Sequence, residues 1–184
     1  MPAAAPHLDL LRRYHADATE HSGRRLIDHL QGVHALLEAW GDPADTCLAG
    51  LFHSIYGTNI FAHRSAPFSD RTIIRAAIGE RAERFAFLFC TAERPVAFLK
   101  TALEGGAALA DIVHGGANPV TRDDLAALIE IEMANFLEQP EDADDIRLLA
   151  GAIATIERAG PVLSPGARAA LADYLNRQDA QPPR

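Results

Sequence analysis

The stretch LIDHLQGVHALLEAWGDPADTCLAGLFHS, residues 26–54, predicts two consecutive helices and thereby decides the fold class. Gly41 and the Asp-Pro pair after it predict a helix end followed by a turn. The second segment starts at Ala44, continues to Tyr56 and is apolar on nearly every side, which is typical of a buried central helix. In the first segment apolar residues recur at the spacing of one helix face, at Leu26, Leu30, Val33, Leu37 and Trp40.

The rest of the chain keeps this helical period. Ser69 is the expected N-cap of a helix, after a polar stretch at 59–69 that is long for a connection between helices. Thr121 and Asp124 resemble a capping box that opens another helix. Residues 114–119 are expected to form a loop, and we find no convincing strand alternation. Besides the two helices above, we expect helices at about 69–79, 80–92, 96–112 (one or two short ones), 125–139, 142–158 and 165–178.

These segments predict an all-α fold, a single-domain helical bundle of about seven to nine helices. We expect an N-terminal helical extension at 1–20, the main domain at 21–178 and a disordered tail at 179–184. Cys47 and Cys90 are too few for a disulfide framework and are expected to pack as small core residues.

Composition and charge exclude several functional classes. The formal net charge is -8, which disfavours duplex nucleic acid and anionic lipid as partners, because both demand basic patches. No apolar run approaches the ~18 residues of a membrane helix, so no membrane association is expected. The N-terminus lacks the basic start and apolar centre of a secretion signal, and we expect a cytoplasmic protein. The expected partner is a small-molecule ligand or substrate, and a homo-oligomer is left open.

Histidines are the most informative local feature, since five of the eight lie between positions 21 and 63. His29 flanks the apolar stripe of the first helix, and His53 lies near the end of the buried second helix. Two imidazoles that reach a core from different helices can share a transition metal, because each offers a neutral nitrogen lone pair. The alternative is a pair of buried histidines that are hydrogen-bonded to backbone carbonyls.

The spacing of His29 and His53 resembles the opening of HD-superfamily domains, particularly the RelA/SpoT-type hydrolases of guanosine tetraphosphate. The segment IIRAAIGERAERFAFLF also resembles the IxxxFGxxVAxLV segment of those hydrolases. The later segment IEIEMANFLEQ resembles the helix with their last aspartate ligand, and Asn135 falls at that position. The resemblance covers about residues 21–139, and the chain as a whole also resembles a bacterial family of HD-like proteins that carry FHSIYGT. It implies an HD-like helical bundle.

The sequence departs from the ligand pattern that this resemblance implies, which is His, His-Asp and a distant Asp. Ser54 and Asn135 replace the two aspartates, while Gly57 and Thr58 replace a Glu-Asp pair that orients the attacking water. Carboxylates balance the charge of a divalent metal and accept protons from its water, so manganese would bind badly. The expected cofactor is a transition metal, with iron, zinc and copper as alternatives. The ligand set would be completed by one of His21, His34, His63 or Glu132.

Other residues near the two histidines are candidates for chemistry. Tyr56 follows His53 by nearly one helical turn, and is either a general acid, radical site or ligand donor, or a core tyrosine bonded to backbone. Arg24 and Arg25 suit a phosphate. The acidic residues of the later helix are expected on a solvated face: Glu130, Glu132 and Glu138.

Two functions follow from these observations. The first is an HD-like metal-dependent enzyme, a hydrolase or oxygenase with an altered site. Its substrate would be a small molecule, and whether this molecule carries a phosphate group is left open. The second is a catalytically inactive HD-like module that binds a small molecule or nucleotide for regulation. The candidate residues are His29, His53 and His63 for the metal, Ser54, Tyr56 and Asn135 for catalysis, and His21, Arg24, Arg25, His34 and Thr58 for ligand binding.

Overall fold

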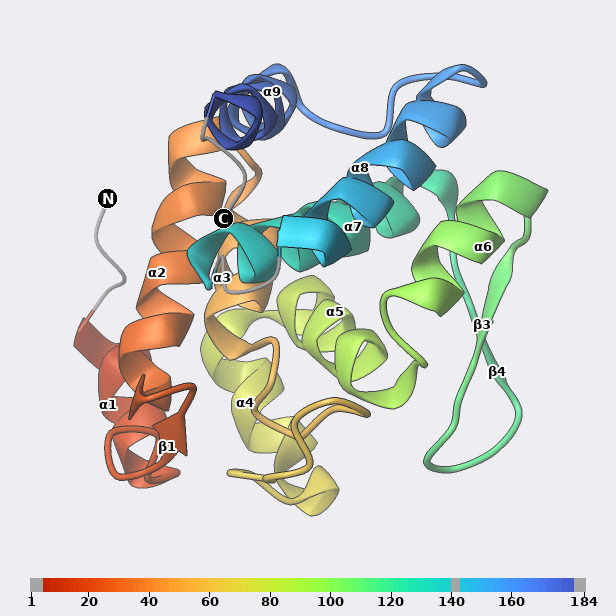
Figure 1. The fold of residues 1–184 in the computed structure, drawn as a ribbon. Coiled ribbons are helices and arrows are strands. Elements are labelled where there is room, and N and C mark those ends of the chain that lie inside the picture. The colour runs from red at the N-terminus through yellow and green to blue at the C-terminus, as the bar shows by residue number, and fades with distance from the viewer. Residues whose placement is uncertain (1–4, 140–142, 181–184) are drawn as a thin grey trace.

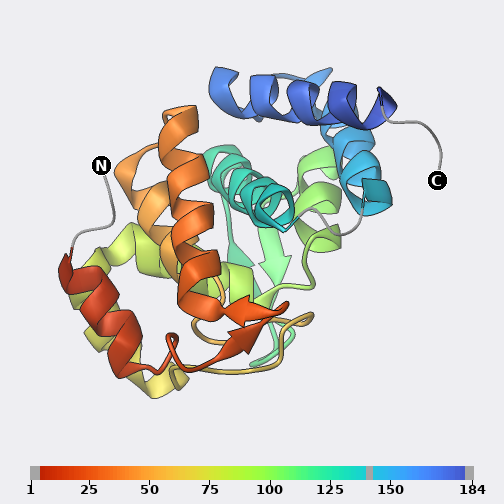
Figure 2. The same cartoon turned by 60° about the vertical axis from the view of Figure 1, so that its left-hand side comes forward.

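Helix α7, Arg122–Glu138, lies at the centre of the molecule, with α2 and α3 on one side and α6 and α8 on the other (Figure 2). The computed structural model describes residues 5–139 and 143–180, and helices dominate these two ranges (Figure 1). The helices are α1 Ala5–Arg13, α2 Leu26–Trp40, α3 Ala44–Phe52, the 3-10 helix η1 Phe68–Asp70, α4 Arg71–Ile78, α5 Glu80–Thr91, α6 Val96–Glu104, α7, α8 Ala143–Glu157 and α9 Pro165–Asp179.

The predicted all-α single-domain fold is confirmed, and the nine α-helices of the described residues fall within the predicted number. Helix α2 ends where the sequence indicated, because Gly41 adopts the left-handed conformation with φ of 84°. The capping box at the start of α7 is also present, since Thr121 accepts a hydrogen bond from the Asp124 amide and Asp124 accepts one from the Thr121 amide.

Helix α3 is shorter than predicted, and this places His53 at its end. The helix stops at Phe52, and residues 53–56 form turns rather than a further helical turn. Gly50 lets α2 and α3 approach closely, because a Cβ at this position would overlap Leu37 Cδ1 and lie 3.2 Å from Val33 Cγ1. The close approach brings the C-terminal end of α3 next to the inner face of α2.

Two short antiparallel hairpins correct the prediction that the chain has no strands. The first pairs β1, Glu20–His21, with β2, Arg24–Arg25. Its two loop residues, Ser22 and Gly23, both have positive φ, as a tight hairpin turn requires. The second pairs β3, Ala108–Ala110, with β4, Ala117–Pro119, where one or two short helices and a loop were expected. Strands of two or three residues are too short to show an alternating pattern.

Two further boundary predictions, for Ser69 and for the C-terminal tail, need correction. Ser69 lies inside η1 and donates to Asp70, so the N-cap position of α4 is Asp70. The predicted N-terminal extension contains α1, while residues 1–4 lie outside the described residues. Of the predicted disordered tail, Asp179 is the last residue of α9, and residues 181–184 are also not described. No helix in the described ranges is long and apolar enough to cross a membrane.

Candidate metal and ligand site

Three polar side chains from different parts of the chain meet at the centre of the fold. His29 lies on α2, His53 directly follows α3, and Asn135 lies on α7. His29 Nε2 is 3.4 Å from His53 Nε2 and 3.1 Å from Asn135 Oδ1. His29 is 0% exposed and His53 2% exposed, so both rings are enclosed by protein. The fold therefore brings together two of the three predicted metal ligands, His29 and His53, and Asn135, which occupies the position of the last aspartate ligand in the resemblance.

His53 directs a lone pair at His29. Its Nδ1 lies 2.7 Å from the Gly50 carbonyl oxygen, which can only accept, so Nδ1 carries the hydrogen. Burial and then the neighbouring His29 ring hold the pKa of His53 well below its usual value. The ring is thus neutral, and its Nε2 has no hydrogen to donate to His29.

His29 is oriented by a carboxylate that the sequence analysis placed on a solvated face. Its Nδ1 contacts Glu138 Oε2, and Glu138 also forms an ion pair with Arg24 of the first hairpin. The Glu138 side chain is only 9% exposed, so the solvated-face prediction is wrong for this residue. Gly32, one turn after His29, makes room for the contact, because a Cβ there would overlap the Glu138 carboxyl group. A carboxylate that accepts a hydrogen bond from one ring nitrogen of a histidine fixes the ring orientation and makes the other nitrogen a stronger ligand for a metal.

The facing Nε2 atoms have the spacing that a shared metal ion requires. Both Nδ1 atoms are hydrogen-bonded to oxygens, and the two Nε2 atoms face each other across 3.4 Å. A tetrahedral ion with two imidazole nitrogens at ~2.0–2.1 Å holds them about 3.3–3.4 Å apart. Asn135 supplies a neutral oxygen as a third donor. This donor set fits zinc, iron or copper and suits a hard cation poorly, because it contains no carboxylate.

The third donor is an amide, and the site is therefore not a group of three conventional ligands. Within residues 5–139 and 143–180, no three His, Cys, Asp or Glu side chains are grouped to hold a metal ion. His63, the third metal ligand expected from the sequence, does not form such a group with His29 and His53. Its side chain is exposed, and its Nε2 lies 3.3 Å from Thr19 Oγ1.

The first hairpin places two further candidate residues beside His29. His21 and Arg24 are paired across β1 and β2, and the centroids of the His21 and His29 rings are 4.8 Å apart. Phe61 covers the His21 ring edge-on, at 4.4 Å between centroids. Burial, followed by the neighbouring His29 and Arg24, lowers the pKa of His21 to about 4. His21 is therefore neutral near pH 7 and can accept or donate one hydrogen bond next to His29.

A buried ion pair lies on the other side of His53. Arg94 and Glu132 contact each other and are 6% and 1% exposed, and burial raises the pKa of Glu132 above its usual value. The Arg94 guanidinium lies 4.6 Å over the Phe89 ring, which is itself 5.1 Å from the His53 ring. The solvated-face prediction is thus wrong for Glu132, and it is wrong for the equally buried Glu130.

A cavity of about 190 Å³ opens beside the segment that follows His53. Tyr56, Thr58, Arg64 and Cys90 are among its lining residues, and Cys90 Sγ donates to the His53 carbonyl oxygen at 3.1 Å. Arg64 Nε donates to the Tyr56 carbonyl oxygen at 3.0 Å, which fixes a cation at the cavity. The Arg64 guanidinium could therefore pair with a small anionic molecule in this cavity.

Tyr56 and Thr58 are held by bonds of their own. The Tyr56 hydroxyl donates to the buried carboxylate of Glu83 at 3.0 Å, and burial together with Glu83 raises the Tyr56 pKa. The alternative considered above, a core tyrosine whose hydroxyl is bonded to backbone, is therefore wrong, because the hydroxyl bonds a side chain. Thr58 Oγ1 accepts from the amides of Ile60 and Phe61 and so shapes the turn. Both residues line the cavity.

The structure places the remaining candidates in three different settings. Ser54 is buried, and its hydroxyl has no hydrogen-bond partner among the described residues. His34 is buried one and a half turns along α2 from His29, with its Nδ1 3.7 Å from Glu38, and burial lowers its pKa. Arg25 is exposed and bonds Asp28 through two nitrogens at 2.7 and 2.8 Å, so its guanidinium is already paired with a carboxylate.

Sequence reasoning missed the residues that support the site. Glu138 is separated from His29 by 109 positions and Arg94 from Glu132 by 38, so no local pattern links them. One signal was present, since Glu132, Asn135 and Glu138 are spaced three apart and must share one face of α7.

Comparison with known proteins gives one match. Residues 10–94, less than half of the chain, match a family model described as Domain of unknown function (DUF6817). The matched region contains His29 and His53 but ends before Asn135 and Glu138. Comparisons with curated proteins and with solved structures found no match. Nothing in these comparisons connects the chain to the HD superfamily.

Proposed function

We propose that this chain is an HD-like protein with an altered metal site, and that it is a metal-dependent enzyme for a small molecule. His29 and His53 would hold a zinc, iron or copper ion through their Nε2 atoms, with the Asn135 oxygen as a third donor. The observation that carries the proposal is the 3.4 Å separation of the two Nε2 atoms, with both Nδ1 atoms bonded to oxygens. The HD-like assignment is supported by the meeting of His29, His53 and Asn135, the three positions that the resemblance singled out.

The bound metal would supply Lewis-acid chemistry for hydrolysis or, as iron or copper, redox chemistry for an oxygenase. The chain itself orients the two imidazoles, through Glu138 on His29 and the Gly50 carbonyl on His53. His21, neutral near pH 7 and with its ring 4.8 Å from that of His29, is a group beside the site that can take or give a proton. Arg64 at the neighbouring cavity, and Arg24 at the rim of the site, favour a substrate with a negative group such as a phosphate ester.

Metal analysis of the freshly purified protein tests this proposal directly. We expect about one zinc, iron or copper per chain, and titration of the stripped protein should give saturable binding of Zn²⁺. His29→Gln and His53→Gln should each abolish stoichiometric binding, whereas His34→Gln, a buried histidine on the same helix, should leave it unchanged. Asn135→Asp should tighten binding at least tenfold, because a carboxylate adds charge to the donor set. Absence of saturable binding in the wild-type chain would overturn the proposal.

One observation favours a second function, a regulatory module that binds without catalysis. The Nε2 atoms are enclosed, since His29 is 0% and His53 2% exposed, and the direct donors include no carboxylate to accept a proton from water. This function predicts that a small anion raises the melting temperature without being turned over. The discriminating measurement is product formation from a panel of phosphate esters with metal-loaded protein. Turnover that disappears in His53→Gln would exclude the module.

A further inference from the structure

A second and larger cavity lies on the opposite part of α7 from the histidine pair. It has a volume of about 370 Å³, within the usual range for sites that enclose small organic molecules. Leu125 forms part of its wall and precedes Asn135 by ten positions, which is about 15 Å along the helix axis. The two sites therefore share a helix but no residue, and this inference does not depend on the function proposed above.

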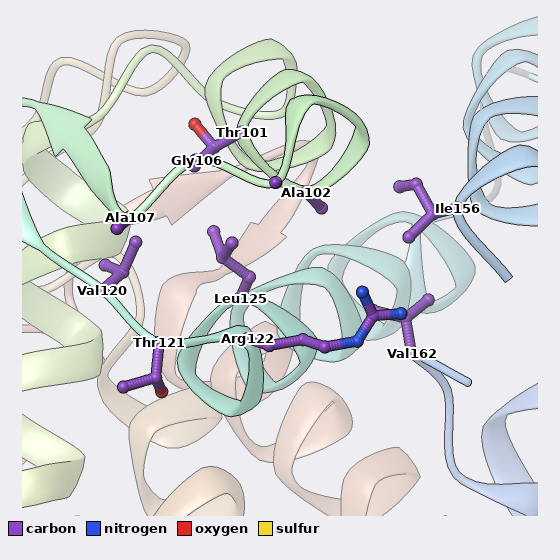
Figure 3. A pocket seen from close by; sticks show the side chains of 11 residues that line it. Thr101, Ala102, Gly106, Ala107, Val120, Thr121, Arg122, Leu125, Ile156 and Val162 are labelled. Carbon is purple, nitrogen blue, oxygen red and sulfur yellow. The ribbon is translucent and has the colours of Figure 1, made fainter. Parts of the chain in front are cut away.

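The wall of this cavity is largely apolar and comes from four parts of the fold. Ala102 lies near the end of α6, Val120 and Leu125 border the start of α7, and Ile156 and Val162 come from α8 and the segment after it (Figure 3). Val120, Leu125, Ile156 and Val162 are buried side chains, so the wall is part of the packed core. An apolar body that entered here would replace water at an apolar surface, which is favourable.

One cation is positioned at this apolar cavity. The Arg122 side chain runs along it toward Val162, as Figure 3 shows. Its Nη2 donates to the Gly160 carbonyl oxygen at 2.8 Å, and no carboxylate among the described residues forms an ion pair with it. Gly160 has φ of 140°, and a Cβ there would lie 3.1 Å from Arg122 Nη2. Glycine at this position thus permits the positive φ and leaves room for the Arg122 guanidinium.

We propose that this cavity binds a small monocarboxylate whose apolar body fills the space between α6, α7 and α8 and whose carboxylate pairs with Arg122. The guanidinium keeps free N–H donors after its bond to Gly160, and a planar fork of donors matches a carboxylate. A phosphate monoester or an amine fits less well, because a single arginine beside an apolar wall balances one negative charge.

Binding of three probes with one apolar body tests the proposal on the wild-type chain. The probes are 1-naphthaleneacetate, the corresponding 2-(1-naphthyl)ethanol and 2-(1-naphthyl)ethylamine. Methyl NMR titrations should show saturable shifts at Val120, Leu125 and Val162 with the acid, with a Kd below about 1 mM. The alcohol and the amine should bind at least tenfold more weakly, because neither pairs with a guanidinium.

Two variants locate the site and one serves as a matched control. Arg122→Gln should weaken binding of the acid at least tenfold and leave the alcohol unchanged. Ala102→Leu should weaken both by filling the space. Arg158→Gln removes the same charge from an exposed position outside the cavity and should bind like wild type. No saturable shift below about 10 mM, equal binding of the three probes, or an Arg122→Gln variant that binds the acid normally would each overturn the proposal. The probe series decides the question even if a variant fails to fold.

Discussion

Replacing Gly32 by alanine tests whether the contact between Glu138 and His29 supports the central site. Gly32 lies inside α2, and a Cβ at this position would overlap the end of the Glu138 side chain. That end is flexible, so the helix itself need not move, and the carboxyl group would swing away from His29 instead. The substitution thus removes the contact without changing any charge in the protein, which Glu138→Gln cannot do.

The expected magnitude follows from two opposing terms. Alanine in place of glycine inside a helix stabilises by ~1 kcal/mol. A lost hydrogen bond to a charged group costs ~1.5–3 kcal/mol, so the stripped Gly32→Ala protein should be less stable than wild type by ~0.5–2 kcal/mol. If a metal binds, the loss of the carboxylate behind His29 should also weaken its affinity by ~10–100-fold.

Gly151 supplies the matched control for this experiment. It also lies inside a helix, α8, and a Cβ there would meet nothing within 4 Å. Gly151→Ala should therefore stabilise by up to ~1 kcal/mol and leave metal affinity unchanged. Urea unfolding at pH 7 and competition titration with Zn²⁺ measure both quantities. If Gly32→Ala gains as much stability as Gly151→Ala and binds Zn²⁺ like wild type, the Glu138 contact does not support the site.

Two further predictions concern the frame that carries the site. Burial and contact with Glu130 raise the pKa of Asp42 to about 8, so the stability this proton gives is complete below about pH 4 and lost as pH rises through 8. Asp42→Asn should remove that loss of stability, which is worth at least ~1 kcal/mol after solvent screening, whereas the exposed Asp9→Asn should not. Urea unfolding at pH 5 and pH 8 measures the difference. Parallel pH profiles of wild type and Asp42→Asn would contradict the argument. Gly50→Ala should destabilise by ~1–3 kcal/mol, because its Cβ would overlap Leu37 and separate α2 from α3. A melting temperature equal to that of wild type would show that the helices adjust freely.

The helical fold could be predicted because its signals are local. The apolar stripe of α2, its end at Gly41 and the Thr121 capping box all depend on residues within a few positions, and each is present in the structure. The two hairpins were missed for the same reason, since strands of two or three residues carry too little pattern. In the first of them, the Ser22-Gly23 pair was the available signal, because both residues adopt positive φ in a two-residue turn.

The candidate site could be predicted only in part, because its supporting contacts are long-range. The sequence indicated His29, His53 and Asn135, and the fold brings them together. For Glu138 and Glu132 the sequence predicted an exposed helix face, since a glutamate on a helix is most often exposed, but both side chains are largely buried. Their burial depends on which face of α7 turns toward α2, and this is decided by the packing of helices that are distant in sequence.

The burial of these polar groups is itself an argument that the site has a use. An ion pair such as Arg94–Glu132 gains little over apolar side chains of the same shape, because the cost of removing both charges from water offsets their attraction. The two imidazole nitrogens that face each other at 3.4 Å place further polar groups in the core, which adds to this cost. Proteins depart from apolar core packing chiefly at functional sites. Several of these buried polar groups lie around His29 and His53, where a bound metal would add stabilising contacts.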